Sequence, residues 1–463
     1  MNAEINVKAV LTPSWGENCP ESLNIIIELD GTQAKSGEKL VKFNKRTVNR
    51  EFNRLLKPIK IFDDYGSLEF KEVESVFATH YLLDEIIILR DVIGTVRIEY
   101  AVAIDEGLPN PVFDLGSEPG GAMGSGTTFM PEIPADKLHV TLRWDLSKLP
   151  VDCAAAWTYG RGDSSAITEG NGLQFAGYAF GKLRWVEEGN FGFYWFDAPG
   201  FDGKKIGQWT ASLISKMATF FDDKGGDYRI FTRHKSEPTG QKNCGGTALL
   251  HSYLWIYYED NPPGVDELRH LFPHEAVHNW ITLGRGDEPF GTCTWYVEGT
   301  AEYYSALLPY RYGLIDRKEL IELLNQRCRE YYSNPKLHDS NLDCGALLMK
   351  DLDATRIPYG RGFFYLTGVD EQIRKATNGQ KNLDNVVLEI LRLQRTGVPC
   401  DNETWLELAG KLTGRDMRPE FNAMAAGELV TPHALCFGEE ICVEECVDER
   451  GSLSFRYEVC NEI

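Results

Sequence analysis

The sequence lacks the features that would direct the chain to a membrane or a nucleic acid. Its first residues contain no basic stretch followed by an uninterrupted apolar run, so no secretory signal is expected. No apolar run approaches the ~20 residues that span a bilayer, because candidates such as EIIILRDVIGTV carry charges. Basic residues are scarce, with 48 Lys and Arg against 69 Asp and Glu, and the net charge of −21 repels phosphate backbones and anionic lipids. We therefore expect a cytoplasmic protein without nucleic-acid or membrane partners.

The sequence also lacks the cysteine pattern of a disulfide framework. It has 11 cysteines, an odd number, and most lie singly between Cys19 and Cys400, which is typical of reduced thiols. Only residues 431–463 form a cysteine-rich tail, which contains Cys436, Cys442, Cys446 and Cys460. Their spacing matches no standard zinc-ligand pattern, so ordinary thiols or a disulfide are favoured over a zinc site in the tail.

What is present suffices for more than one domain: 463 residues, 43% hydrophobic and 11% aromatic. Residues 1–165 contain short segments rich in β-branched residues, such as SLNIIIELD and KLHVTLRWDL, and indicate a β-rich N-terminal domain. Residues 166–430 change to mixed α and β, with strands expected at FGFYWF, YRIFTRH and TALLHSYLWIYY, and then become mostly helical. The glycine-rich residues 116–129 lack a Gly-Lys-Ser/Thr ending and are expected to form a mobile loop. The fold class predicted is α+β.

The segment HLFPHEAVHNW, residues 270–280, carries the strongest chemical signal. On a helix, His274 and His278 lie one turn apart on one face, where both can present a ring nitrogen to one metal ion. Glu275 then lies beside that face, toward a metal-bound water. A chance His-Glu-x-x-His pattern is expected in roughly one such chain in a hundred, so a third ligand would decide the matter. His270 is interpreted as a surface or core histidine, because Pro273 separates it from the pair.

Three further segments follow a recognisable order: CGGTALLHSYL at residues 244–254, TWYVEGTAEYY at 294–304, and a segment beginning PYGRGFFYLTG at 358. In order and spacing they resemble the Gly-Gly edge strand, the Trp-x-x-Glu-Gly helix and the Tyr-x-Lys-Gly helix of the glycyl aminopeptidase family of gluzincin zinc metallopeptidases. That family is related to aminopeptidase N and leukotriene hydrolase. The resemblance covers about residues 170–430 and implies a thermolysin-like catalytic domain within residues 166–430.

The resemblance also implies roles for individual residues. His274, His278 and Glu298 would hold one Zn²⁺ per chain and leave a fourth position for water, from which Glu275 would take a proton. Tyr359 would donate a hydrogen bond to the developing oxyanion; without the family pattern it would be interpreted as a core aromatic. The remaining candidates are Gly245, Gly246 and His251 for substrate binding, with a structural role equally open for His251, and Glu302 as a partner of a ligand histidine or as a solvated carboxylate.

The sequence departs from the family in four places. Leu250 precedes His251 where close relatives place a glutamate that binds the substrate amine. Pro273 precedes the first ligand, so the helix is expected to begin near Pro273 or to be kinked there. Arg361 replaces the lysine, and residues 431–463 leave no room for the family's PDZ domain.

The function favoured is a zinc metallopeptidase with a peptide or small-molecule substrate. The first alternative is a zinc enzyme of the same fold that acts as a hydrolase, lyase or cyclase on a non-peptide molecule. This alternative rests on Leu250, because loss of the amine-binding carboxylate frees the pocket for another substrate. A non-catalytic binding protein is the second alternative, and the presence of both Glu275 and Tyr359 argues against it.

Overall fold

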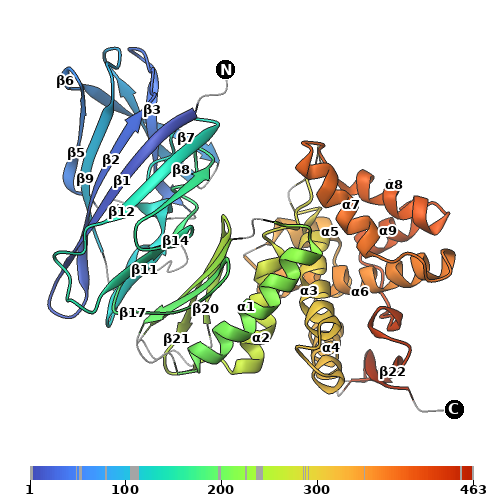
Figure 1. Ribbon diagram of the computed structural model, residues 1–463. Helices are drawn as coiled ribbons and strands as arrows, with labels where there is room; N and C mark the ends of the chain where they lie inside the picture. Colours follow the sequence, from blue (N-terminus) through green and yellow to red (C-terminus); the bar gives the residue numbers. More distant parts are fainter. Residues whose placement is uncertain are drawn as a thin grey trace. The chain divides into compact units, whose positions relative to one another are not determined.

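The computed structural model shows an α+β chain that clusters into two compact units (Figure 1). It describes residues 4–47, 50–51, 55–78, 81–104, 114–196, 200–224, 227–235, 243–284, 286, 288–289, 291–348, 350–448 and 451–460. The first unit comprises Met1–Ala211 and Gly225–Leu268, and the second comprises Ser212–Lys224 and Arg269–Ile463. This division differs from the predicted domain limits at residues 165 and 430, which remain predictions.

The N-terminal part of the first unit is built of β-sheets. A seven-stranded sheet has the order β15-β12-β1-β2-β9-β5-β6, a four-stranded sheet the order β4-β3-β8-β7, and a five-stranded sheet the order β10-β11-β16-β13-β14. The strands are β1 (Glu4–Trp15), β2 (Pro20–Asp30), β3 (Lys39–Thr47), β4 (Arg50–Glu51), β5 (Leu55–Asp63), β6 (Gly66–Ser67), β7 (Phe70–Ala78), β8 (Tyr81–Ile88), β9 (Val96–Ala103), β10 (Gly116–Glu118), β11 (Gly121–Ser125), β12 (Lys137–Trp144), β13 (Ala154–Trp157), β14 (Gly160–Arg161), β15 (Ser164–Thr168) and β16 (Gly177–Gly181).

Alternation of buried and outward side chains explains this β-rich part. Along β1, Val7, Ala9 and Leu11 are buried while the residues between them are more exposed, as expected for a sheet with one face against a core. The prediction of a mobile loop at residues 116–129 is wrong, because this segment contains β10 and β11. Its glycines permit close packing: a Cβ at Gly124 would lie 2.4 Å from the carbonyl oxygen of Asp114.

A mixed five-stranded sheet of order β17-β18-β19-β21-β20 completes the first unit. Its strands are β17 (Leu183–Glu188), β18 (Phe191–Phe196), β19 (Tyr228–Lys235), β20 (Asn243–Leu249) and β21 (Ser252–Tyr258). The strands predicted at FGFYWF and YRIFTRH are confirmed as β18 and β19. TALLHSYLWIYY was predicted as one strand, and this is wrong. A turn at Leu250 and His251, where His251 has φ 48°, divides it into the edge strand β20 and the inner strand β21.

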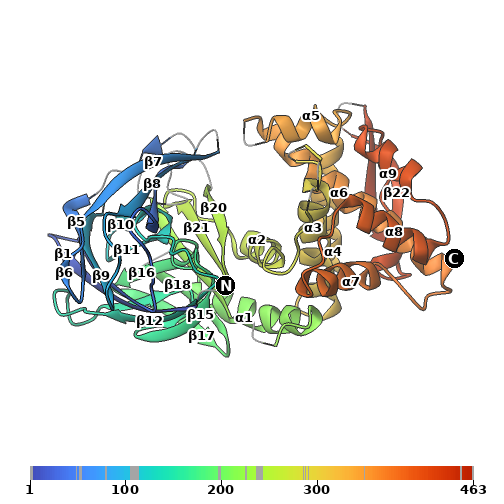
Figure 2. The same ribbon diagram turned by 90° about the horizontal axis from the view of Figure 1, so that it is seen from above.

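The second unit is mostly helical. Its helices are α3 (Thr294–Arg311), α4 (Arg317–Tyr332), α5 (Asn341–Ala346), α6 (Leu352–Ala376), α7 (Asp384–Arg395), α8 (Asn402–Thr413) and α9 (Arg418–Ala425), while α1 (Gly203–Phe220) and α2 (Val265–Val277) each begin in the first unit and end in the second. Helices α3, α4 and α6 pack side by side (Figures 1 and 2). Among the described residues, none of the helices combines the length and the apolarity that a bilayer span requires.

The tail predicted as cysteine-rich forms an antiparallel hairpin of β22 (Ile441–Val447) and β23 (Leu453–Val459). Cys436, Cys442, Cys446 and Cys460 are free thiols, and within the described ranges no metal-binding group forms in the tail. Ordinary thiols, one of the two favoured interpretations, therefore describe it.

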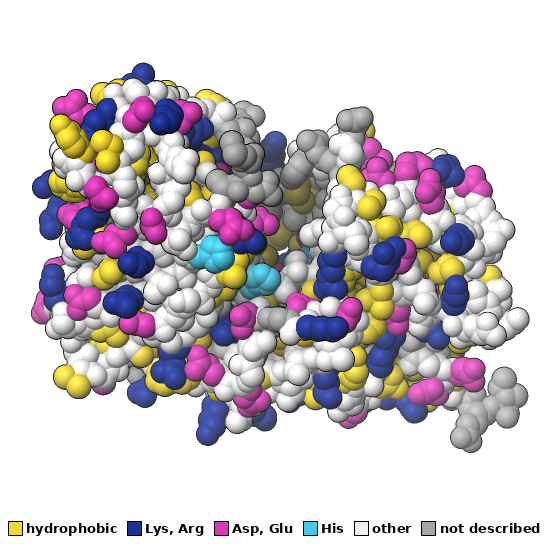
Figure 3. All heavy atoms as spheres, turned by 45° about the horizontal axis from the view of Figure 1, so that its top comes forward, with side chains coloured by type: hydrophobic (Ala, Val, Ile, Leu, Met, Phe, Trp, Pro, Cys, Tyr) yellow, Lys and Arg dark blue, Asp and Glu magenta, His cyan; other side chains and the backbone are white. Residues whose placement is uncertain are grey.

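On the face drawn in Figure 3, acidic and basic side chains are interspersed.

Candidate metal centre

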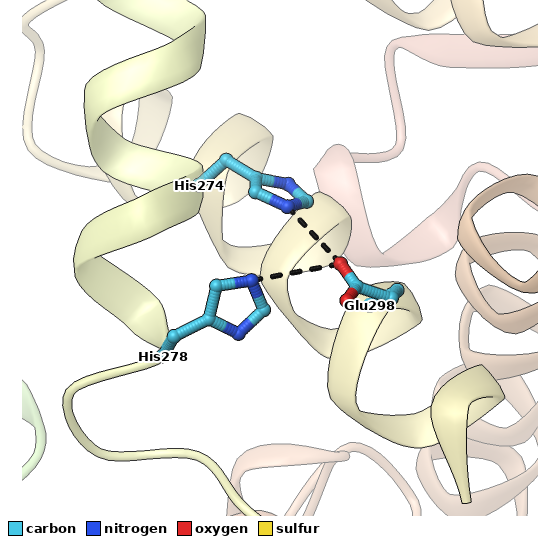
Figure 4. Close-up of side chains that lie close together, drawn as sticks. All are labelled: His274, His278 and Glu298. Atoms are coloured by element: carbon cyan, nitrogen blue, oxygen red, sulfur yellow. Dashed lines mark ion pairs between the residues drawn. The ribbon is translucent and has the colours of Figure 1, made fainter. Parts of the chain in front are cut away.

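Two helices bring together the candidate metal ligands, all of which belong to the second unit. His274 and His278 lie on α2 and Glu298 lies in the second turn of α3. Oε2 of Glu298 is 3.3 Å from Nε2 of His274 and 3.5 Å from Nε2 of His278 (Figure 4). One ligand atom from each residue lies within 4.8 Å of the other two. The three residues that the sequence assigned to one metal ion therefore converge.

The surroundings of Glu298 fit a metal ion. Its Oε2 atom is buried, and no described donor reaches it with good hydrogen-bond geometry. A buried carboxylate oxygen without a partner is costly, and a cation between it and the two imidazoles would remove that cost. Two imidazoles and one carboxylate are a typical ligand set of a catalytic zinc, which keeps one position open.

The metal-binding helix begins earlier than expected. Helix α2 starts at Val265, and Pro273 lies inside it rather than at its start, so the predicted start near Pro273 is wrong. The alternative expectation of a kink at Pro273 remains a prediction. A proline inside a helix removes one N–H donor, and its ring clashes with a carbonyl of the preceding turn; packing can offset this cost. Both Phe272 and Pro273 are buried, and their packing accounts for the continuation.

Glu302 makes the contacts of a residue that supports a metal ligand. Its Oε1 is 3.0 Å from Nδ1 of His274, on the ring edge opposite the nitrogen that faces Glu298. Arg327 of α4 lies on its other side, with Nε 2.6 Å from Oε2 of Glu302, and also donates to Oγ of Ser305 at 3.1 Å. Because the Glu302 side chain is only 12% exposed, it is not the solvated carboxylate that the sequence left open.

The charges around His274 shift the pKa values of this group. Burial would raise the pKa of Glu302, but the positive charge of Arg327 and the contact with His274 hold it well below its ordinary value. Burial would lower the pKa of His274, but Glu302 and Glu298 raise it to about 10. Burial and Arg327 lower the pKa of His270 to about 3, so this histidine is neutral. His270 is not among the described residues that form the metal-binding group, and its interpretation as a surface or core histidine remains a prediction.

Tyr359 of α6 lies against the metal ligands. Its ring stacks on the ring of His274, with centroids 5.6 Å apart and an interplanar angle of 5°. Burial and the nearby carboxylates of Glu298 and Glu275 raise the pKa of Tyr359 far above its ordinary value, so the phenol keeps its proton and can donate it in a hydrogen bond. Glu275 is half-buried, one residue after His274.

Two glycines set the distance between the helices that carry Glu298 and Tyr359. A Cβ at Gly299 would lie 2.5 Å from the backbone of Gly362, and one at Gly362 would lie 1.9 Å from the carbonyl oxygen of Trp295. Any side chain there would push α3 and α6 apart. The glycines in VEGTA and PYGRG thus let the two helices approach closely enough for Tyr359 to reach the metal ligands.

The remaining candidates have other surroundings. Arg361 is fully buried and donates to Oδ1 of Asn341 and to the carbonyl oxygens of Leu337 and Asp339, so it braces the chain before α5. Gly245 and Gly246 lie in edge strand β20, whereas His251 lies in the turn after it and is exposed. These three residues belong to the first unit, and their part in substrate binding remains a prediction.

Arg327 carries no signal in the sequence that marks it as part of the site. It lies on α4, outside every motif that marks the site, and only the packing of α4 against α3 brings it to Glu302. A helical pattern alone cannot tell which of several arginines turns inward.

Comparisons with known proteins show what this fold is similar to. No family model and no curated protein matches the chain. An aminopeptidase N family protein from Idiomarina loihiensis is similar in structure with a TM-score of 0.70 and 14% identity, over 96% of this chain and 80% of that one. An M1 zinc metallopeptidase variant from Deinococcus radiodurans, bound to a Tyr-Ser-Ala substrate, gives a TM-score of 0.52 and 14% identity over 93% and 95% of the two chains. At this identity the similarity shows the fold, and the chain therefore has the α+β fold of these zinc metallopeptidases.

Proposed function

We propose that the protein is a zinc-dependent hydrolase, and most specifically a gluzincin metallopeptidase related to the glycyl aminopeptidases. The observation that carries the proposal is the convergence of His274, His278 and Glu298, whose ligand atoms lie within 4.8 Å of one another. The stacking of Tyr359 on His274 supports it, because a proton donor then lies beside the ligands. Structural neighbours with a bound Tyr-Ser-Ala substrate and a bound L-tryptophan support a peptide or small-molecule substrate.

Each residue of the site has a separate role in the proposed reaction. A zinc ion held by His274, His278 and Glu298 would supply a Lewis acid that polarises a carbonyl and activates water. Glu275 accepts the proton of the attacking water and passes it to the leaving amine. The phenol of Tyr359 donates a hydrogen bond to the oxyanion, a contribution on the order of 3 kcal/mol to the barrier.

A second candidate function is hydrolysis, elimination or cyclisation of a non-peptide molecule, and Leu250 favours it. Where close relatives of the family would bind a substrate amine with glutamate, this chain has an apolar side chain, Leu250, in the turn directly after β20. Glu302 is not free to replace that glutamate, because it is already engaged by Arg327 and His274. A buried ammonium without a carboxylate costs several kcal/mol, so a substrate with a blocked amine or without one should be preferred.

Mass spectrometry of peptide mixtures incubated with the zinc-loaded protein tests the proposal. Each peptide is supplied with a free and an acetylated amino terminus, and Glu275→Gln is compared with Glu407→Gln, which changes an exposed carboxylate on α8. We expect cleavage to fall about 100-fold or more in Glu275→Gln with zinc retained, because glutamine cannot accept the proton. Undiminished cleavage by folded Glu275→Gln would contradict the proposal, and a clear preference for free amines would contradict the inference from Leu250.

A further inference from the structure

Arg356 lies beside Tyr359, one of the two candidate catalytic residues. It lies on α6, one turn before Tyr359, and its guanidinium carbon is 5.3 Å from the centroid of the Tyr359 ring. The same ring is stacked on the ring of His274. A planar cation therefore lies against the aromatic ring that contacts a metal ligand, an arrangement that orients a guanidinium.

Arg356 is exposed and has no carboxylate partner among the described residues. The two other arginines of α6 differ: Arg361 donates to Asn341 and to backbone carbonyls, and Arg374 pairs with Asp370 at 2.5 Å. In a chain of net charge −21, acidic groups are plentiful. An arginine that no described acidic group neutralises, next to the candidate site, keeps its hydrogen-bond donors available for a ligand.

The sum of the charges at the site favours an anion as the ligand of Arg356. The three carboxylates of the site, on Glu275, Glu298 and Glu302, are balanced by Arg327 and by the divalent ion that the ligands fit. The positive charge of Arg356 is additional to this balance. Guanidinium groups bind carboxylates through paired, charge-assisted hydrogen bonds, and an oriented guanidinium loses less entropy on binding.

We propose that Arg356 binds a carboxylate of the substrate, within one or two residues of the bond that is cleaved. The range follows from the stack: Arg356 contacts the ring of Tyr359, and an extended peptide advances only about 3.3–3.6 Å per residue. The carboxylate is either the carboxy terminus of a short peptide or an Asp or Glu side chain. This inference rests on the proposed function, because it places the reacting carbonyl next to Tyr359.

The test compares three tripeptides that differ in the position of their carboxylate. Trialanine carries it at the carboxy terminus, Ala-Ala-Asp amide carries it on a side chain, and trialanine amide has none; each is used with a free and an acetylated amino terminus. We expect kcat/KM to be on the order of 10-fold higher for at least one carboxylate peptide than for trialanine amide, mainly through KM. Arg356→Gln should abolish this preference, and Arg356→Glu should reverse it. Arg329→Gln, which changes an exposed arginine on α4 that has no ion-pair partner among the described residues, is the matched control and should keep the preference.

A binding measurement separates this inference from the proposed function. Zinc-loaded Glu275→Gln protein, with and without Arg356→Gln, is titrated with the same three peptides in a calorimeter. Selective binding of a carboxylate peptide that depends on Arg356, without cleavage by the wild type, would sustain the carboxylate site at Arg356 and overturn the peptidase proposal. Cleavage with equal kcat/KM for acid and amide forms would overturn the inference alone. A loss in Arg356→Gln that is equal for all three peptides, or no binding of any of them, would also overturn the carboxylate site.

Discussion

Each of the two units buries a carboxylate against a histidine, and the two pairs behave oppositely. In the first unit, Oε2 of Glu118 lies 3.1 Å from Nδ1 of His234 and accepts a hydrogen bond from the His234 backbone N–H at 2.9 Å. In the second, Oε1 of Glu302 lies 3.0 Å from Nδ1 of His274. Burial raises the pKa of Glu118 to about 8, whereas the pKa of Glu302 lies well below its ordinary value.

A nearby arginine explains the difference. Arg327 contacts Glu302 directly, with Nε 2.6 Å from Oε2. Arg233 lies near Glu118 but directs Nη1 to the carbonyl oxygen of Met123, at 2.6 Å, and lowers the pKa of Glu118 too little to offset burial. A buried carboxylate thus stays ionised only where a cation contacts it, and only the ionised carboxylate is suited to orient a metal-binding imidazole.

Removing the cation of Arg327 should have the largest effect, a decrease in the free energy of unfolding. Arg327→Met leaves the charge of Glu302 buried without its partner, so we expect the free energy of unfolding to fall by about 3–5 kcal/mol in urea denaturation of the metal-free protein. Arg329→Met, on the exposed side of α4, should change it little. The double variant Arg327→Met with Glu302→Gln removes both charges and should recover part of the loss. A single variant as stable as the wild type would show that Arg327 does not hold Glu302 ionised.

Removing the carboxylate should weaken metal binding. Glu302→Gln keeps the size of the side chain but loses the charge that acts on Nδ1 of His274, and loss of such an outer partner typically lowers metal affinity about 10–100-fold. Competition with a chelator measures the zinc affinity, and Glu407→Gln is the control. The interpretation of Glu302 would be wrong if the two variants bound zinc equally well.

The pair of Glu118 and His234 in the first unit should have a smaller effect on stability. This effect should appear as a dependence of stability on pH. With an ordinary pKa of 4.5 and a raised pKa of about 8 in the folded state, Glu118 holds a proton in the folded protein that the unfolded chain has released. Stability should therefore decrease as the pH rises from about 5 to 8. Glu118→Gln should flatten this part of the curve of Tm against pH. Parallel curves for the two proteins would contradict the neutral state of Glu118.

The strands and the metal motif were predictable because their signals are local. FGFYWF is a short apolar run, YRIFTRH is a short segment that contains aromatic and β-branched residues, and His274 and His278 need only a helix to face one ion. The turn at Leu250 and His251 is not predictable from the sequence, because it contains neither Gly nor Pro. In addition, His251 adopts a positive φ, a backbone angle that residues other than glycine rarely adopt. The early start of α2 was missed because tertiary packing outweighs the effect of Pro273.

The outer part of the site could not be predicted to the same degree. Whether Glu302 was solvated or bonded to a ligand depended on its burial, which is set by the packing of α3 against α4 rather than by its neighbours in sequence. The same holds for Arg327 and Arg356, which occur in no motif. Tyr359 was singled out only through the family resemblance, and its contact with His274 depends on the close approach of α3 and α6 at Gly299 and Gly362.

The zinc content of the purified protein tests the central claim most directly. Elemental analysis of the wild type should find close to one zinc per chain, because two imidazoles and one carboxylate converge on a single position. His278→Ala removes one of these ligands and should lose most of the metal, whereas substitution of the exposed His251 by alanine should leave the zinc content unchanged. Full zinc in a folded His278→Ala protein, or none in the wild type after zinc loading, would contradict the assignment of this site.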